Sequence, residues 1–209
     1  ESLREVLGML DRVPGLRFDA IGIQSHMRDR AWTAAEIRGA CERIAAWPEA
    51  RGVPLHFTEI SFPSGPRIGG ADAWGPSDEA GEAFQAEAVE LIYRTLFAQP
   101  QVVAATWWDF CDLGAWEGVP IGLLRRDMSR KPACELLRRL IRGEWWTDLE
   151  LLTGPDGRAA ARVFFGRHEL VLPGPDGAER TIRFDYPRPW PPQAARNAVK
   201  RFKAAVAPL

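Results

Sequence analysis

The spacing of apolar residues over residues 1–142 changes repeatedly between a helical and a strand-like period. Near-continuous apolar runs predict three strands, at residues 18–23, 53–58 and 102–107. Apolar residues three and four positions apart predict a helix before each strand and a fourth helix after the last one. Thr33 and Glu36 form a capping box that marks the start of the second helix. This alternation indicates an α/β fold with a parallel sheet.

The pattern changes after Gly143, where short alternating stretches predict strands instead of helices. These stretches are residues 145–152, 159–165, 169–172 and 181–186, and two copies of Gly-Pro-Asp-Gly, at 154–157 and 174–177, predict the turns between them. We therefore expect a first domain over 1–142, a small antiparallel β accessory domain over 143–186, and a Pro-rich linker with a basic terminal helix over 187–209.

Composition limits the classes of function. The chain has 209 residues, of which 46% are hydrophobic, so it can bury a core. Its net charge of -1 provides no field that would attract nucleic acid or a membrane surface, so neither is expected as a partner. Three cysteines without a CxxC pair predict free thiols and no metal site. The sequence contains no signal peptide and no apolar run of transmembrane length.

Chemistry-bearing residues stand at the ends of all three predicted strands: Gln24-Ser25-His26, Thr58-Glu59 and Trp107-Trp108-Asp109. The carboxyl ends of parallel strands meet at one edge of a sheet, where reactive groups collect. A carboxylate nucleophile for sugar chemistry needs hydrogen-bond donors that keep it ionised and an apolar platform for the ring. Each residue alone also fits a structural role, as an ion-pair partner, a core histidine or core filling.

Four stretches resemble glycoside hydrolase family 10, the retaining endo-β-1,4-xylanases. They are Asp19 to His26, Pro54 to Ile60, Thr106 to Phe110 followed by Asp112 and Trp116, and Gly122 to Leu124 with Lys131-Pro132-Ala133. The resemblance covers residues 1–142 and implies the C-terminal part of a (β/α)₈ TIM barrel, in which the three predicted strands are the sixth, seventh and eighth.

The resemblance also implies roles for single residues. Glu59 matches the catalytic nucleophile, His26 the histidine that orients it, and Gln24 a substrate-binding glutamine beside it. Trp108 and Trp116 match the tryptophans that wall the sugar subsites. The expected partner is xylan or a xylooligosaccharide, and no cofactor or metal is implied. Polymer-degrading relatives are usually exported, which implies a secreted or periplasmic protein.

One catalytic group of the family has no counterpart in this sequence. The general acid/base glutamate lies on the family's fourth strand, and no matching motif occurs here. Asp109, Asp112 and Glu117 share one strand end or its loop, so their spacing gives no reason for any of them to face the leaving group. We therefore expect the N-terminal barrel half to be supplied in cis or by another chain, and this chain alone to be inactive.

Two other functions remain open at this point. The chain could be a non-catalytic carbohydrate-binding protein that keeps Trp108 and Trp116, or a half-barrel that assembles through its open sheet edge. The particular polysaccharide and the choice between endo and exo action depend on residues that the motifs do not include.

Overall fold

The computed structural model describes residues 2–70, 73–174 and 177–188. It divides into two compact units, Glu1–Ile141 and Arg142–Leu209, which are described separately. The predicted basic terminal helix lies outside the described residues. The first unit contains, in order, α1 (Leu3–Asp11), β1 (Ile21–His26), α2 (Ala34–Ala46), β2 (Leu55–Ser61), α3 (Glu79–Phe97), β3 (Val102–Trp107) and α4 (Pro132–Arg139). A π-helical segment, Leu140–Glu144, follows α4 and includes the boundary between the two units.

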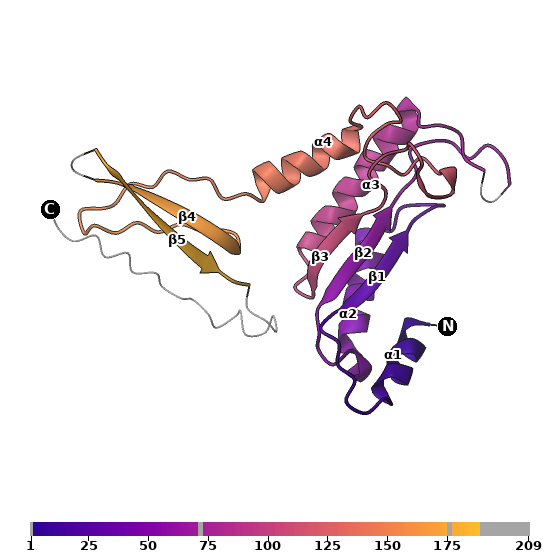
Figure 1. Cartoon of the computed structure of the whole chain (residues 1–209), viewed down its shortest axis with the longest axis horizontal. Helices are drawn as coiled ribbons and strands as arrows, with labels where there is room; N and C mark the ends of the chain where they lie inside the picture. Colours follow the sequence, from indigo (N-terminus) through magenta and orange to yellow (C-terminus); the bar gives the residue numbers. More distant parts are fainter. Residues whose placement is uncertain (1, 71–72, 175–176, 189–209) are drawn as a thin grey trace. The chain divides into compact units, whose positions relative to one another are not determined.

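The three strands of the first unit form one parallel sheet in the order β1-β2-β3. A helix lies between each strand and the next along the chain, and Figure 1 shows α2 and α3 against the same face of the sheet. The Thr33 hydroxyl accepts a hydrogen bond from the backbone N–H of Glu36, and the Glu36 carboxylate accepts one from the backbone N–H of Thr33, which confirms the predicted capping box. The predicted α/β fold is confirmed.

The bounds of two strands, β1 and β2, differ from the prediction. β1 begins at Ile21 and extends through His26, so Gln24 and His26 are paired strand residues and do not follow the strand. In the same way β2 contains Glu59 and ends at Ser61. The predicted limits followed apolar runs. The observed limits follow backbone pairing, which polar residues sustain equally well on the face opposite α2 and α3.

β2 carries one more residue than its neighbours at the level of Thr58. Ile23 pairs with Phe57, but the next residue, Gln24, pairs with Glu59. In the pairing with β3, Phe57 pairs with Ala105 and Ile60 with Trp107, so three residues of β2 are matched by two residues of β3. Such a bulge reverses which face the following side chains occupy. It therefore places Glu59 on the face opposite Phe57.

The core lies between the sheet and its helices. Leu55, Phe57 and Ile60 of β2 are almost fully buried, as are apolar residues of α2 and α3 that include Ile37 and Val89. The other face of the sheet carries Gln24, His26 and Glu59, whereas Ser25 pairs with Ile60 and is buried on the core side. No helix in the described part of the chain is long and apolar enough to span a membrane.

Close backbone contact fixes the start of α3. A Cβ atom at Gly81 would lie 2.3 Å from the carbonyl oxygen of Ser64, in the loop after β2. The absence of a side chain at Gly81 thus allows the first turn of α3 to pack directly on this loop. The Asp78 side chain caps the same turn by accepting a hydrogen bond from the Gly81 N–H.

The described part of the second unit contains a hairpin, β4 (Gly166–Pro173) paired with β5 (Glu179–Tyr186). The first and last glycines of each Gly-Pro-Asp-Gly sequence form the same two backbone hydrogen bonds: Gly157 donates to Gly154 and Gly177 to Gly174, while Gly154 donates to Arg158 and Gly174 to Ala178. The strands predicted at 145–152 and 159–165 do not form, however, and the side chain of Leu152 is almost fully exposed. Alternation alone does not make a strand, because a strand also needs a paired neighbour.

Candidate active site

Glu59 lies at the open face of the sheet between side chains from β1. Gln24 Nε2 donates to Glu59 Oε1 over 3.0 Å, and His26 Nε2 lies 3.0 Å from Glu59 Oε2. Each carboxylate oxygen therefore has one partner, and the Glu59 side chain is only 23% exposed. The structure thus brings together three of the predicted site residues in a geometry that holds the carboxylate in one orientation.

Ser61 belongs to the same cluster, although sequence reasoning did not identify it. Its Oγ lies 2.8 Å from His26 Nδ1, on the side of the imidazole ring opposite Glu59. Ser61 is buried and is the direct pairing partner of His26. The sequence did contain an indication that Ser61 lies near Glu59, because residues two apart in a strand share a face.

Trp116 is brought to the cluster from the loop after β3. Its ring centroid lies 5.3 Å from that of His26, with a tilt of 37° between the planes. The guanidinium of Arg28 lies over the Trp116 ring at 4.9 Å and forms an ion pair with Glu117. Trp116 remains 44% exposed, so part of its surface is open to a ligand. Arg28 was not predicted to belong to the site.

Trp108 follows β3 directly and is 37% exposed. Its backbone N–H donates to the carbonyl of Ile60, the residue after Glu59, which fixes the start of the loop at the level of the carboxylate. The Asp109 carboxylate then accepts a hydrogen bond from the backbone N–H of Trp116 over 2.8 Å. Both tryptophans are therefore tied to the same loop, and the Asp109 carboxylate helps to shape it.

Asp112 is buried in an ion pair with Lys131, so its carboxylate is not available as a catalytic acid. Lys131 Nζ lies 2.8 Å from both Asp112 carboxylate oxygens and 2.7 Å from Ser64 Oγ. These three acceptors match the three N–H donors of the ammonium group. Burial lowers the pKa of Lys131, and the Asp112 carboxylate opposes that shift. Both residues belong to the motifs that resemble family 10, but the sequence did not predict that they form a pair.

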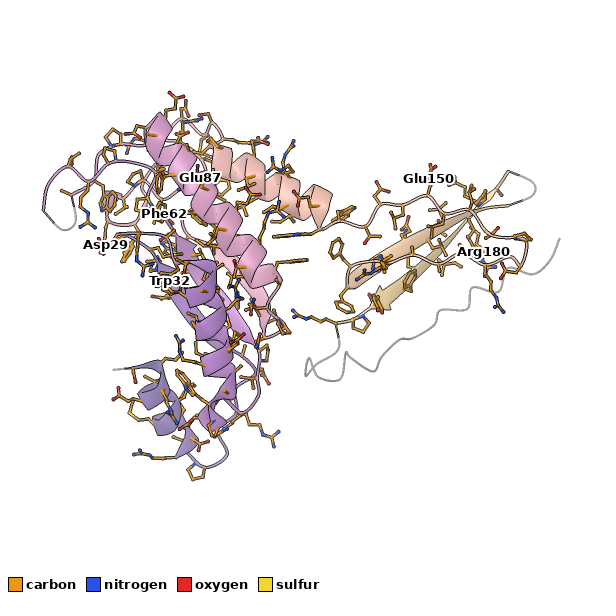
Figure 2. The ribbon with its side chains drawn as sticks, turned by 180° about the vertical axis from the view of Figure 1, so that it is seen from behind. Asp29, Trp32, Phe62, Glu87, Glu150 and Arg180 are labelled. Carbon is orange, nitrogen blue, oxygen red and sulfur yellow. The ribbon has the colours of Figure 1, made fainter. Side chains whose placement is uncertain are left out.

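A groove of about 580 Å³ lies beside this cluster, and Glu59 is not among its lining residues. Asp29 and Phe62, which follow β1 and β2, both line it and lie near each other in Figure 2. Its aromatic lining also includes Trp74 and Phe84. Within the described ranges, no group of three His, Cys, Asp or Glu side chains is placed to hold a metal ion.

Comparison with known proteins identifies the family. The sequence profile of glycosyl hydrolase family 10 matches residues 6–138, which is more than half of the chain. The chain belongs to glycosyl hydrolase family 10. The match ends close to the boundary between the two units and includes the whole sheet with all residues of the cluster around Glu59.

Solved structures of family 10 xylanases share the fold. Native xylanase 10B of Thermotoga maritima superposes with a TM-score of 0.52 at 21% identity, over 68% of this chain and 41% of that one. The endo-1,4-β-xylanase XylE of Penicillium canescens gives 0.50 at 21% identity, over 67% and 42%. The chain thus spans about two fifths of the length of these enzymes. The shared fold supports a TIM-barrel-like α/β architecture for the first unit.

A further relative carries a regulatory name. The anti-sigma-I factor RsgI6 of Acetivibrio thermocellus is 23% identical over 164 residues, which are 78% of this chain and 19% of that protein.

Proposed function

We propose that this chain supplies the nucleophile of a retaining glycosidase that cleaves β-1,4-xylosidic bonds in xylan or xylooligosaccharides. The observation that carries the proposal is the paired carboxylate of Glu59, with one hydrogen-bonding partner on each oxygen at the open face of a family 10 sheet. A xylanase 10B structure from Thermotoga petrophila, solved with xylobiose, shares this fold at 21% identity and supports the choice of sugar.

In the proposed reaction, a Glu59 oxygen attacks the anomeric carbon while the bond to the leaving sugar oxygen breaks. The leaving oxygen takes a proton from a general acid, and the glycosyl-enzyme ester is then hydrolysed by water that the same group activates as a base. His26 and Gln24 hold the attacking carboxylate in place. Trp108 and Trp116 offer exposed rings on which the apolar faces of xylose units can stack.

The second carboxyl group must come from elsewhere. A retaining pair requires the two groups about 5–5.5 Å apart. The acids nearest in the chain are already engaged, Asp112 with Lys131, Asp109 with the Trp116 N–H, and Glu117 with Arg28. We therefore assign β1, β2 and β3 to barrel strands six, seven and eight, with the acid/base on strands supplied in cis or by a separate chain.

The sheet supports that assignment. Among the described residues β1 pairs only with β2 and β3 pairs only with β2, so both outer edges present backbone groups to further strands. Light scattering of the purified 209-residue chain tests whether these edges pair between copies. A mass that rises with concentration would indicate assembly, and a constant monomer mass would favour completion in cis.

The catalytic test is Glu59→Gln in the complete enzyme, with xylooligosaccharide hydrolysis as the assay. Removing a nucleophile should lower kcat on the order of 10⁴-fold or more while substrate binding persists. Glu90→Gln is the matched control, because it makes the same substitution at an exposed ion pair on α3, away from the Glu59 cluster. A Glu59→Gln enzyme that retains most of its rate would overturn the assignment.

A second candidate is a non-catalytic carbohydrate sensor. It is favoured by the engagement of all three neighbouring acids in other contacts and by the similarity to an anti-sigma factor. Calorimetry with xylooligosaccharides distinguishes the two functions: saturable binding that Trp116→Ala abolishes, without hydrolysis in the full-length protein, would favour the sensor.

A further inference from the structure

The imidazole of His26 has a polar partner on each ring nitrogen, and the two partners differ in charge. Nε2 faces the Glu59 carboxylate at 3.0 Å, and Nδ1 faces the Ser61 hydroxyl at 2.8 Å. An ionised carboxylate can only accept a hydrogen bond, whereas a hydroxyl can donate as well as accept. The position of the histidine proton therefore depends on what the Ser61 hydroxyl does.

Burial restricts the hydroxyl. Ser61 is 3% exposed, and within the described part of the chain its Oγ forms no other hydrogen bond than the one to His26. Buried O–H donors in proteins almost always find an acceptor. The acceptor in reach is Nδ1, and it can accept only when it carries no proton.

The other two protonation states fit less well. A neutral ring with its proton on Nδ1 would direct the Nε2 lone pair at the Glu59 carboxylate over 3.0 Å. An imidazolium would donate from both nitrogens and leave the buried Ser61 O–H without an acceptor. The neutral ring with its proton on Nε2 is the state that satisfies all four groups in the chain Ser61, His26, Glu59 and Gln24.

We propose that Ser61 is a positioning residue that holds His26 as the neutral imidazole protonated on Nε2, so that Glu59 receives a hydrogen bond but no positive counter-charge. The consequence for catalysis rests on the proposed role of Glu59, because a carboxylate without a cationic neighbour keeps more of its charge for attack on the anomeric carbon. The proton position itself can be measured whether or not that role is correct.

The bulge in β2 makes this arrangement possible. It turns Glu59 and Ser61 together onto the face of Gln24 and His26, where the register pairs Gln24 with Glu59 and His26 with Ser61. One strand thus supplies both the carboxylate and the hydroxyl, and the other supplies the ring between them.

The test is a long-range proton–nitrogen correlation spectrum of the ¹⁵N-labelled 209-residue chain at neutral pH. The sequence contains three histidines, so His26→Gln assigns the ring by removing one set of signals. The expected pattern for His26 is a protonated Nε2 and an unprotonated Nδ1 that accepts a hydrogen bond. A wild-type ring with both nitrogens protonated, or with the proton on Nδ1, would overturn the proposal.

Variants at position 61 separate a positioning role from a merely structural one. Ser61→Thr keeps the hydroxyl and should keep the wild-type pattern. Ser61→Asp replaces the donor with a charged acceptor and should protonate both nitrogens, while Ser61→Ala should move the Nδ1 resonance toward that of an acceptor without a hydrogen bond. Identical His26 spectra for wild type, Ser61→Asp and Ser61→Ala would refute the role of Ser61.

Unchanged signals of His56 and His168 in each variant serve as the control for folding. If the larger changes prevent folding, the wild-type spectrum still decides the protonation state. An active Glu59→Gln enzyme would remove the catalytic consequence but would leave the measured proton position intact, so the two failures can be told apart.

Discussion

The buried pair of Lys131 and Asp112 connects the start of α4 to the loop after β3, and replacing Lys131 with Met should weaken the fold strongly. The Lys131 side chain is 0% exposed and that of Asp112 is 5% exposed. Methionine preserves most of the apolar stem but removes all three N–H donors. Asp112 would then keep the Gly122 N–H as a partner but would lose its counter-charge.

The expected magnitude follows from the burial of the charge that remains. Removing one partner of a buried ion pair costs about 3–5 kcal/mol, because an uncompensated charge stays in a poorly solvated site. Since domains of this size unfold with about 5–15 kcal/mol, the variant should lose roughly a fifth or more of its stability. The assay is urea unfolding followed by far-UV circular dichroism, which reports on the α-helices of the first unit.

Two controls define the refuting result. Lys131→Met combined with Asp112→Asn removes both charges and should recover part of the lost stability. Glu90→Gln breaks the ion pair with Arg94, in which the side chains are 41% and 42% exposed, and should cost less than about 1 kcal/mol. If Lys131→Met costs no more than Glu90→Gln, or if the double variant is no more stable than the single one, the reasoning from burial is wrong.

Three further predictions concern other parts of the first unit. Gly81→Ala should cost about 1–3 kcal/mol in urea unfolding, because its Cβ would lie 2.3 Å from a carbonyl oxygen, whereas Gly8→Ala in α1, with open space around it, should stabilise the protein by up to about 1 kcal/mol. The hydrogen bond from Arg30, followed by those from Thr33, holds the pKa of Glu36 at about 2, below its ordinary value of 4.5. The stability advantage of wild type over Glu36→Gln should therefore be complete above pH 4.5 and should disappear as the pH falls toward 2. Burial raises the pKa of Cys41 to about 11, so this thiol should resist alkylation in the folded protein and react after unfolding; rapid modification of the native chain would contradict its burial.

Local patterns predicted the elements of the first unit well because each is specified by neighbours in sequence. The capping box at Thr33 depends on a residue three positions away, and the limits of β3 match the predicted run at 102–107. The pairing of Lys131 with Asp112 depends on residues 19 positions apart, and no periodicity encodes it. The stretch at 145–152 shows the opposite failure, since it has the alternation of a strand but no paired neighbour.

The bulge at Thr58 is the feature that the sequence pattern concealed and on which the site depends. In a regular strand Phe57, Glu59 and Ser61 would share one face, because side chains alternate with a period of two. Phe57 is 2% exposed beneath the helices, so Glu59 on that face would be a carboxylate in an apolar core. Burying such a charge without partners is strongly unfavourable, and the extra residue in β2 avoids it by turning the carboxylate to the open face. There it forms hydrogen bonds with Gln24 and His26. The same backbone irregularity thus keeps the core apolar and assembles the carboxylate cluster. For this reason the residue types of the site could be predicted from the sequence, whereas their mutual geometry depends on the pairing of the strands.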